Sequence, residues 1–260
     1  MIRTSASTPA RRCSLRLHIE HHAEALNSLL AERSAMLDMM AHEVRQPLNN
    51  ASAALQSATA LLAARGEIEA SEQLRRTQAV LGTVLNDVSN TLAAIMLLAG
   101  AGDAELADTD LEMVVQIAIG EMPTVERGRI GVQRRTSLRT VWVDPALTRL
   151  ALRNLLANAL AFSPPDAPVL LVLSDVEEPA AWFIDVIDRG PGFAAELLPR
   201  LFQRGARGTH GGPAGRSSHG LGLFIVRRAM ELQGGQALPL ANSASGSTLR
   251  LQVNASGAAD

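Results

Sequence analysis

A histidine and a glutamate stand next to each other in the segment His42-Glu43-Val-Arg-Gln46-Pro-Leu48. A neutral imidazole is a competent nucleophile toward phosphorus, and an adjacent carboxylate can accept or orient its proton. Val44 and Leu48 continue an apolar helical stripe, which predicts that His42 and Glu43 lie on or near the solvent face. For this histidine taken alone, an ordinary surface residue is the alternative.

Two asparagines, Asn154 and Asn158, stand one helical turn apart and are expected to face the same way. Buried amides at this spacing can hold a hydrated Mg2+ and the phosphates that it bridges, because Mg2+ prefers oxygen ligands and keeps part of its water. A pair of capping or surface amides is the alternative interpretation.

A turn of the form Asp188-x-Gly190-x-Gly192 follows an apolar segment that reads as a strand. A carboxylate at a strand end can accept a hydrogen bond from an adenine amino group, and the two glycines let the backbone come close to the base. Taken by itself, this pattern is a common turn.

The segment Gly220-Leu221-Gly222 opens an apolar helix. Free backbone N–H groups at a helix N-terminus favour phosphate. A dinucleotide-binding loop is not predicted here, because no strand directly precedes the segment and the third glycine of that fingerprint is absent.

Two long helices are expected over residues 15–99: the first carries the His42 motif, and both precede the other three motifs. The first apolar stripe ends near Leu62, and Arg65-Gly66 interrupts the pattern. The second stripe contains a seven-residue repeat that is typical of a coiled-coil seam, formed by Leu74, Leu81, Val88 and Ile95. An antiparallel hairpin cannot bury both faces alone, so we expect two copies to form a dimeric four-helix bundle.

The periodicity changes after a small, flexible segment at residues 100–105, which predicts a linker. Helices and strands then intermix without strict alternation, so an α+β chain with a two-layer α/β sandwich over residues 106–256 is expected. The expected helices are 110–122, 145–162 and 221–232, and the expected strands are 130–135, 140–143, 169–173, 182–187 and 247–253.

The composition excludes several classes of protein. A net charge of -2 gives no electrostatic case for nucleic acid. Cys13 is the only cysteine, so no internal disulfide forms and a reducing compartment fits. The longest apolar run, 92–102, is too short to cross a bilayer, and residues 1–14 read as a disordered tail. We therefore expect a cytoplasmic protein without a membrane segment.

In the order H-E-x-R-x-P-L, N-x-x-x-N, D-x-G-x-G and G-L-G-L, the motifs resemble those of bacterial two-component sensor histidine kinases, from about Leu15 to Val253. The resemblance implies a HisKA-like dimerisation and phosphotransfer hairpin, followed by an ATP-binding Bergerat domain of the type shared with gyrase, mismatch-repair and heat-shock chaperone ATPases. It also implies ATP and Mg2+ as ligands, and a homodimer that phosphorylates a response regulator receiver domain. No sensory domain fits before Leu15, so either the input arrives from an upstream sensory protein or the chain is a truncated core.

The resemblance also implies roles for individual residues. An amide at Asn154 implies a kinase rather than an ATPase, because related ATPases have a water-activating glutamate there. Leu201-Phe202 resembles the start of the family's F box, whereas Ala161 and Gly205 depart from the family pattern. The implied roles are phosphoacceptor for His42, general base for Glu43, Mg2+ binding for Asn158 with Asn154 in support, adenine recognition for Asp188 beside Gly190 and Gly192, and phosphate contacts for Gly220, Leu221 and Gly222.

Gln46 lies one helical turn beyond His42, and its amide is hypothesised to orient a water that dephosphorylates the partner. A polar surface residue is the equal alternative for this position. For the whole chain, one alternative is a histidine phosphotransfer protein with a degenerate nucleotide domain, which ATP binding would exclude. Another is a serine/threonine kinase or ATPase on the same fold, which acid-labile phosphate on the protein would exclude.

Overall fold

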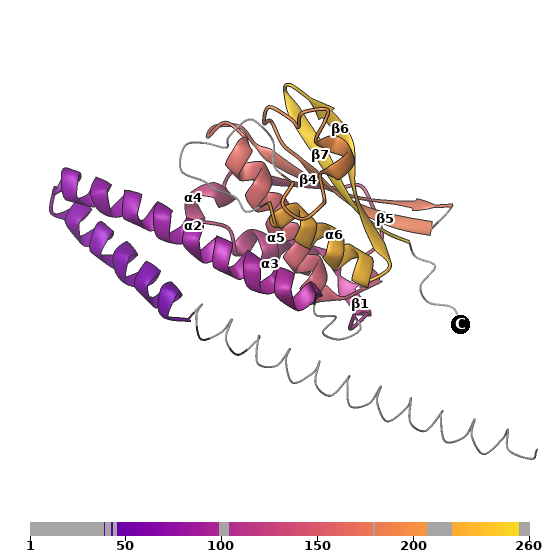
Figure 1. The fold of residues 1–260 in the computed structure, drawn as a ribbon, viewed down its shortest axis with the longest axis horizontal. Helices are drawn as coiled ribbons and strands as arrows, with labels where there is room; N and C mark the ends of the chain where they lie inside the picture. The colour runs from indigo at the N-terminus through magenta and orange to yellow at the C-terminus, as the bar shows by residue number, and fades with distance from the viewer. Residues whose placement is uncertain are drawn as a thin grey trace, which may run out of the picture.

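The computed structural model describes residues 39, 43, 46–98, 104–178, 180–206 and 220–254. His42, the expected N-terminal tail and most of the expected linker lie outside the described residues. The described chain contains a helical hairpin followed by an α/β sandwich, as Figure 1 shows, and this confirms the α+β fold class predicted from the sequence.

The hairpin consists of a helix over residues 46–64 and helix α2 (Ile68–Leu98). The turn between them is a Schellman motif centred on Gly66, whose φ of 77° places it in the left-handed region. The Gly66 N–H donates to the carbonyl of Ala63 at 3.1 Å, and the Glu67 N–H donates to the carbonyl of Leu62 at 3.0 Å. The expected interruption at Arg65-Gly66 is therefore a capped helix end that reverses the chain.

Helix α2 is long and apolar enough, by length and composition alone, to cross a membrane. The expectation of no membrane segment considered only unbroken apolar runs and did not foresee this. The last turns of α2 pack against the sandwich instead: Ala94 and Leu97 are buried in one cluster with Ile225. Arg228 also donates to the carbonyl of Leu97 at 3.4 Å, so this end of α2 has a protein partner.

The sandwich contains a mixed five-stranded sheet in the order β2-β4-β5-β7-β6, in which only β2 and β4 pair in parallel. A separate antiparallel pair, β1-β3, leads into the helices. The strands are β1 (Ala107–Asp110), β2 (Ile130–Arg134), β3 (Thr140–Val143), β4 (Val169–Glu177), β5 (Ala180–Ile187), β6 (Gly235–Ser243) and β7 (Gly246–Asn254).

The helices form the second layer, and Figure 1 shows α3, α5 and α6 gathered on one side of the sheet. One core joins the layers, where Leu152, Leu155 and Leu156 of α5 pack with Leu171, Ile184 and Leu251 of the sheet. Burial of such side chains is the main stabilising term of the sandwich. The helical elements are α3 (Leu111–Gly120), α4 (Thr124–Arg127), α5 (Pro145–Phe162), η1 (Leu198–Arg200) and α6 (Gly222–Leu232).

Candidate active site

Helix α5 is held in place at its first turn, which joins three parts of the fold. Asp144 is its N-cap, and one carboxylate oxygen accepts from the N–H groups of Ala146 and Leu147. The other oxygen accepts from the N–H of Glu105 at 3.0 Å. Gln233, at the end of α6, accepts from the Asp144 N–H at 3.2 Å. This junction fixes α5 relative to α6 and to the segment that enters the sandwich.

The next two turns of α5 carry Asn154 and Asn158. Asn154 is buried, and its Nδ2 donates to the carbonyl of Leu150 at 2.9 Å. Its Oδ1 faces the start of α6, because a Cβ added to Gly222 would lie 3.4 Å from that oxygen. Asn158 is half-buried one turn further on. The structure therefore brings Asn154 of the predicted amide pair next to the predicted glycine motif of α6.

Gly222 is the first residue of α6 and Leu221 is its N-cap. No side chain caps this helix end among the described residues, so its first N–H groups stay available to an acceptor. Gly220, at a φ of 64°, turns the chain into the helix. An uncapped helix N-terminus beside buried amides has the chemistry of an anion site.

Asp188 follows β5 directly, as predicted, and the residue is 8% exposed. Its Oδ1 accepts from the Gly190 N–H at 2.7 Å and from the Ser247 N–H at 3.3 Å, and its Oδ2 accepts from the Ser247 hydroxyl. A carboxylate has about four acceptor positions, so three donors leave one for a ligand. Sequence reasoning missed Ser247, because nothing in the pattern of β7 showed which strand would lie beside the turn.

The hairpin motif lies on a different element. Glu43 and Gln46 are helical and exposed, whereas His42 lies outside the described residues. The structure therefore places three of the four predicted motifs on the sandwich, where Asn154 and Gly222 lie close together, and leaves the described residues of the fourth on the hairpin. The F-box pair Leu201 and Phe202 is buried in the sandwich core.

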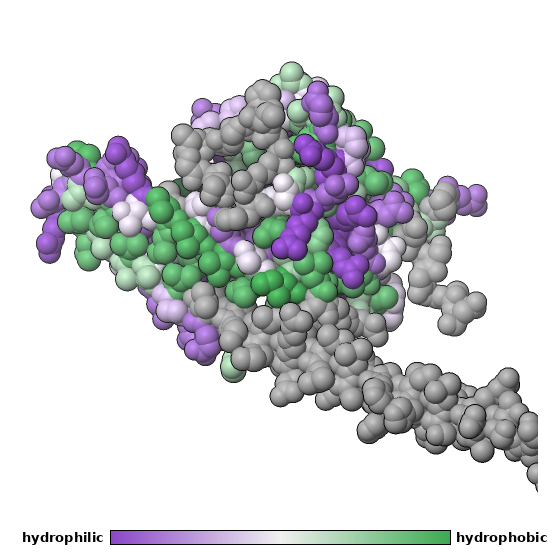
Figure 2. Space-filling model, in the orientation of Figure 1, coloured by the Kyte–Doolittle hydropathy of each residue, from purple (hydrophilic) through white to green (hydrophobic). Residues whose placement is uncertain are grey.

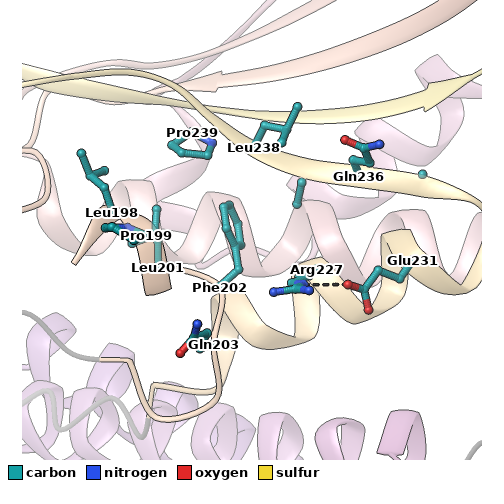
Figure 3. Close-up of a pocket in the computed structure, with 12 residues that line it drawn as sticks. Leu198, Pro199, Leu201, Phe202, Gln203, Arg227, Glu231, Gln236, Leu238 and Pro239 are labelled. Carbon is teal, nitrogen blue, oxygen red and sulfur yellow. Dashed lines mark hydrogen bonds and ion pairs between the residues drawn. The ribbon is translucent and has the colours of Figure 1, made fainter. Parts of the chain in front are cut away.

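A surface cavity of about 390 Å³ lies elsewhere, between η1, α6 and β6. Figure 3 shows Phe202 at its centre and the ion pair between Arg227 and Glu231 at its edge. None of the predicted site residues lines it. This cavity is therefore separate from Asp188 and from the Asn154–Gly222 contact.

Comparison with protein families matches residues 143–256 to the histidine kinase-, DNA gyrase B- and HSP90-like ATPase domain. The chain is 30% identical to the sensor protein PfeS of Pseudomonas aeruginosa over 230 residues, which cover 84% of this chain and 46% of PfeS. The chain is thus similar to sensor histidine kinases over most of its own length. It is also 32% identical to the sensor protein QseC of Salmonella typhi, covering 86% of this chain and 49% of QseC.

The adaptive-response sensory kinase SasA of Synechococcus is 29% identical over 91% of this chain and 61% of SasA. The chain thus spans about half of the length of most of these curated relatives. Among solved structures, full-length ShkA in complex with AMPPNP superposes with a TM-score of 0.58 at 24% identity, over 86% of this chain and 47% of ShkA. The Acinetobacter baumannii kinase AdeS superposes with a TM-score of 0.55 at 19% identity, over 83% of this chain and 98% of AdeS. These two likenesses show the fold.

Proposed function

We propose that this chain is an ATP-dependent protein histidine kinase that phosphorylates His42 and passes the phosphoryl group to an aspartate of a response regulator receiver domain. The observation that carries the proposal is the Asp188 carboxylate, buried at the end of β5 with one acceptor position free. It stands in the same domain as the Asn154–Gly222 contact. Homology to sensor histidine kinases supports the same activity.

The residues present fit an adenine nucleotide. The free acceptor position of Asp188 matches the donor that an adenine amino group offers. The first N–H groups of α6, at Gly222 and beyond, suit its phosphates. ShkA, which shares this fold, was crystallised with the ATP analogue AMPPNP. Gly190, Gly192, Gly220 and Leu221 complete the proposed ATP site.

A magnesium ion at this site would depend on amide oxygens. Among the residues that the structure describes, no three His, Cys, Asp or Glu side chains gather as a metal centre. In our proposal Asn158 would hold Mg2+, with Asn154 beside it. Mg2+ accepts so few protein ligands because it keeps several of its waters.

The transfer step forms a bond between an imidazole nitrogen of His42 and the γ-phosphorus and breaks the bond to the β-phosphate oxygen, so that ADP leaves. Glu43, which follows His42 and is exposed, takes the imidazole proton. Asn154 is an amide and a poor base, so it does not activate water against bound ATP. Gln46, also exposed, would orient the water that dephosphorylates the response regulator.

The same proposal places the protein in the cytoplasm as a homodimer, with its input coming either from an upstream sensory protein or from a longer chain of which these residues are the core. We place the phosphotransfer hairpin at residues 15–99 after a tail at 1–14, the linker at 100–105 and the catalytic domain at 106–256. The proposed catalytic domain begins before residue 143, where the family match starts, because Leu111 and Val115 of α3 are buried in the core of that domain.

Incubation of the purified chain with γ-labelled ATP and Mg2+ tests the activity. We expect label on the wild-type chain that acid removes and base does not. His42→Gln should carry no label and should still bind ATP. His22→Gln, which changes another histidine of the N-terminal region, should be labelled like wild type.

Asn158→Ala should lower the labelling rate by tenfold or more, because it removes the proposed Mg2+ ligand. Two results would contradict the proposal: acid-stable label, which indicates a phosphorylated hydroxyl, or full labelling of His42→Gln. A wild-type chain that binds no ATP would leave only a phosphotransfer role.

A further inference from the structure

Asn242, near the end of β6, is bonded to the backbone that leaves the Asp188–Gly192 turn. Its Oδ1 accepts from the Phe193 N–H at 2.7 Å, and its Nδ2 donates to the Phe193 carbonyl at 2.8 Å. One side-chain amide thus bonds both the N–H and the carbonyl of one residue, as a neighbouring strand does in a hydrogen-bonded antiparallel pair. The Asn242 side chain therefore holds the end of the turn against the edge of the sheet.

The turn is held at its other end by the same β-hairpin. The Asp188 N–H donates to the carbonyl of Ser247 at 2.9 Å, and Ser247 in turn donates to the Asp188 carboxylate. Ser247 and Asn242 lie on the two strands of the β6-β7 hairpin, near its tip. Residues 188–193 are therefore tied to one hairpin at both the first and the last residue.

Gly192 shows how closely the two segments approach. It lies at a φ of 68°, and an added Cβ would collide with the carbonyl oxygen of Ser243 and lie 2.7 Å from Oδ1 of Asn242. Phe193, one residue later, packs its ring against the sandwich core. The backbone of the turn thus has little freedom while the Asn242 contacts are made.

We propose that Asn242 is a positioning residue for nucleotide binding: through Phe193 it holds the Asp188–Gly192 turn in the shape that receives the base. The inference rests on the proposed function, because it assigns Asn242 to the same nucleotide site. Asn242 touches neither the base nor the phosphates in this assignment. It lowers the cost of ordering the turn when the nucleotide binds.

Removing the amide gives the first test. In Asn242→Ala, the KM for ATP in autophosphorylation should rise about tenfold, which matches the loss of one or two net hydrogen bonds. The kcat at saturating ATP should stay within about twofold, because bound nucleotide restores the turn. Asn242→Asp keeps the acceptor for the Phe193 N–H but sets an oxygen against the Phe193 carbonyl, so its KM should also rise.

Ser245→Ala is the matched control. Ser245 lies at the tip of the same hairpin and is bonded only to Ser243 among the contacts described for it, so its loss should leave the KM unchanged. Backbone hydrogen exchange in the absence of nucleotide gives a second readout. The Phe193 amide should be protected in wild type and Ser245→Ala and should exchange at least tenfold faster in Asn242→Ala.

An unchanged KM and an unchanged Phe193 exchange rate in Asn242→Ala would overturn the inference. An equal fall of kcat with a matching loss of thermal stability would also overturn it, since that result describes a purely structural residue. In both cases the proposed function would stand if the wild-type chain binds ATP and Asp188→Asn binds it at least tenfold more weakly. A wild-type chain without ATP affinity would remove both.

Discussion

Two buried carboxylates near the end of β5 have different environments, although only two residues separate them. Asp188 is bonded to neutral donors, the N–H groups of Gly190 and Ser247 and the Ser247 hydroxyl. Asp185 forms a two-bond ion pair with Arg250 at 2.7 and 2.8 Å. That hydrogen-bonded partner raises the pKa of Arg250. Asp185 is therefore paired with a cation, whereas the hydrogen bonds described for Asp188 all come from neutral donors.

Asp188→Asn should lower ATP affinity by roughly ten- to a hundredfold, the usual size of a lost hydrogen bond to a charged acceptor. An asparagine places a donor NH2 among the Gly190 and Ser247 donors and removes an acceptor from the base. Calorimetric titration of the purified variant with ATP measures the effect.

Asp185→Asn is the control for this prediction, because it changes a similarly buried carboxylate three residues earlier, on β5. It should destabilise the sandwich, since it weakens the pair with Arg250, but it should leave ATP affinity within about twofold at a temperature where the protein is folded. Equal losses of affinity in the two variants would argue against a specific role for Asp188.

At the scale of the element, the hairpin turn depends on one left-handed residue. Gly66→Ala should cost about 1 kcal/mol in the free energy of unfolding, because an L side chain is strained at a φ of 77°. Gly82 offers the opposite case: it lies within α2, and an added Cβ would meet nothing within 4 Å.

Gly82→Ala should therefore stabilise the hairpin by about 0.5–1 kcal/mol through helix propensity. Urea unfolding followed by circular dichroism compares the two alanine variants with wild type. The same sign for both substitutions would contradict the assignment of Gly66 to the capping position of the turn.

At the scale of the whole molecule, the hairpin exposes more apolar surface than a single copy would be expected to leave in water. Figure 2 shows apolar side chains running along the hairpin toward the sandwich. Val80 and Val84, one turn apart on α2, are 64% and 46% exposed. Large contiguous apolar surface of this kind marks an interface. A second copy of the chain is the partner that the repeat in α2 suits.

Val84→Arg should weaken the proposed homodimer at least about tenfold, because it places a charge in an apolar interface. Asn86→Arg is the control, since Asn86 is an exposed polar residue on a different face of α2. Sedimentation equilibrium measures the dissociation constants. A monomeric wild-type chain at micromolar concentration would contradict the dimer.

Much of this fold could be predicted because its signals are local. Asp144-Pro145 predicts the start of α5, and the structure begins α5 at Pro145 with Asp144 as its cap. Strand β6 was missed because Gly235 and Pro239 are poor strand residues. It exists as an edge strand paired only with β7, a position where proline is tolerated. Strand β1 was missed because four mostly polar residues give no periodicity.

The sequence alone determined the class of chemistry: the order and spacing of the His42, Asn154, Asp188 and Gly220 motifs indicated a histidine kinase, since each motif lies within a few residues. Only the tertiary structure decided which distant residues support them. Ser247 and Asn242 lie about fifty residues beyond the turn that they hold, and they reach it because β7 pairs with β5 and β6 with β7. Such contacts depend on strand order and register, and the residue pattern of β6 or β7 alone specifies neither.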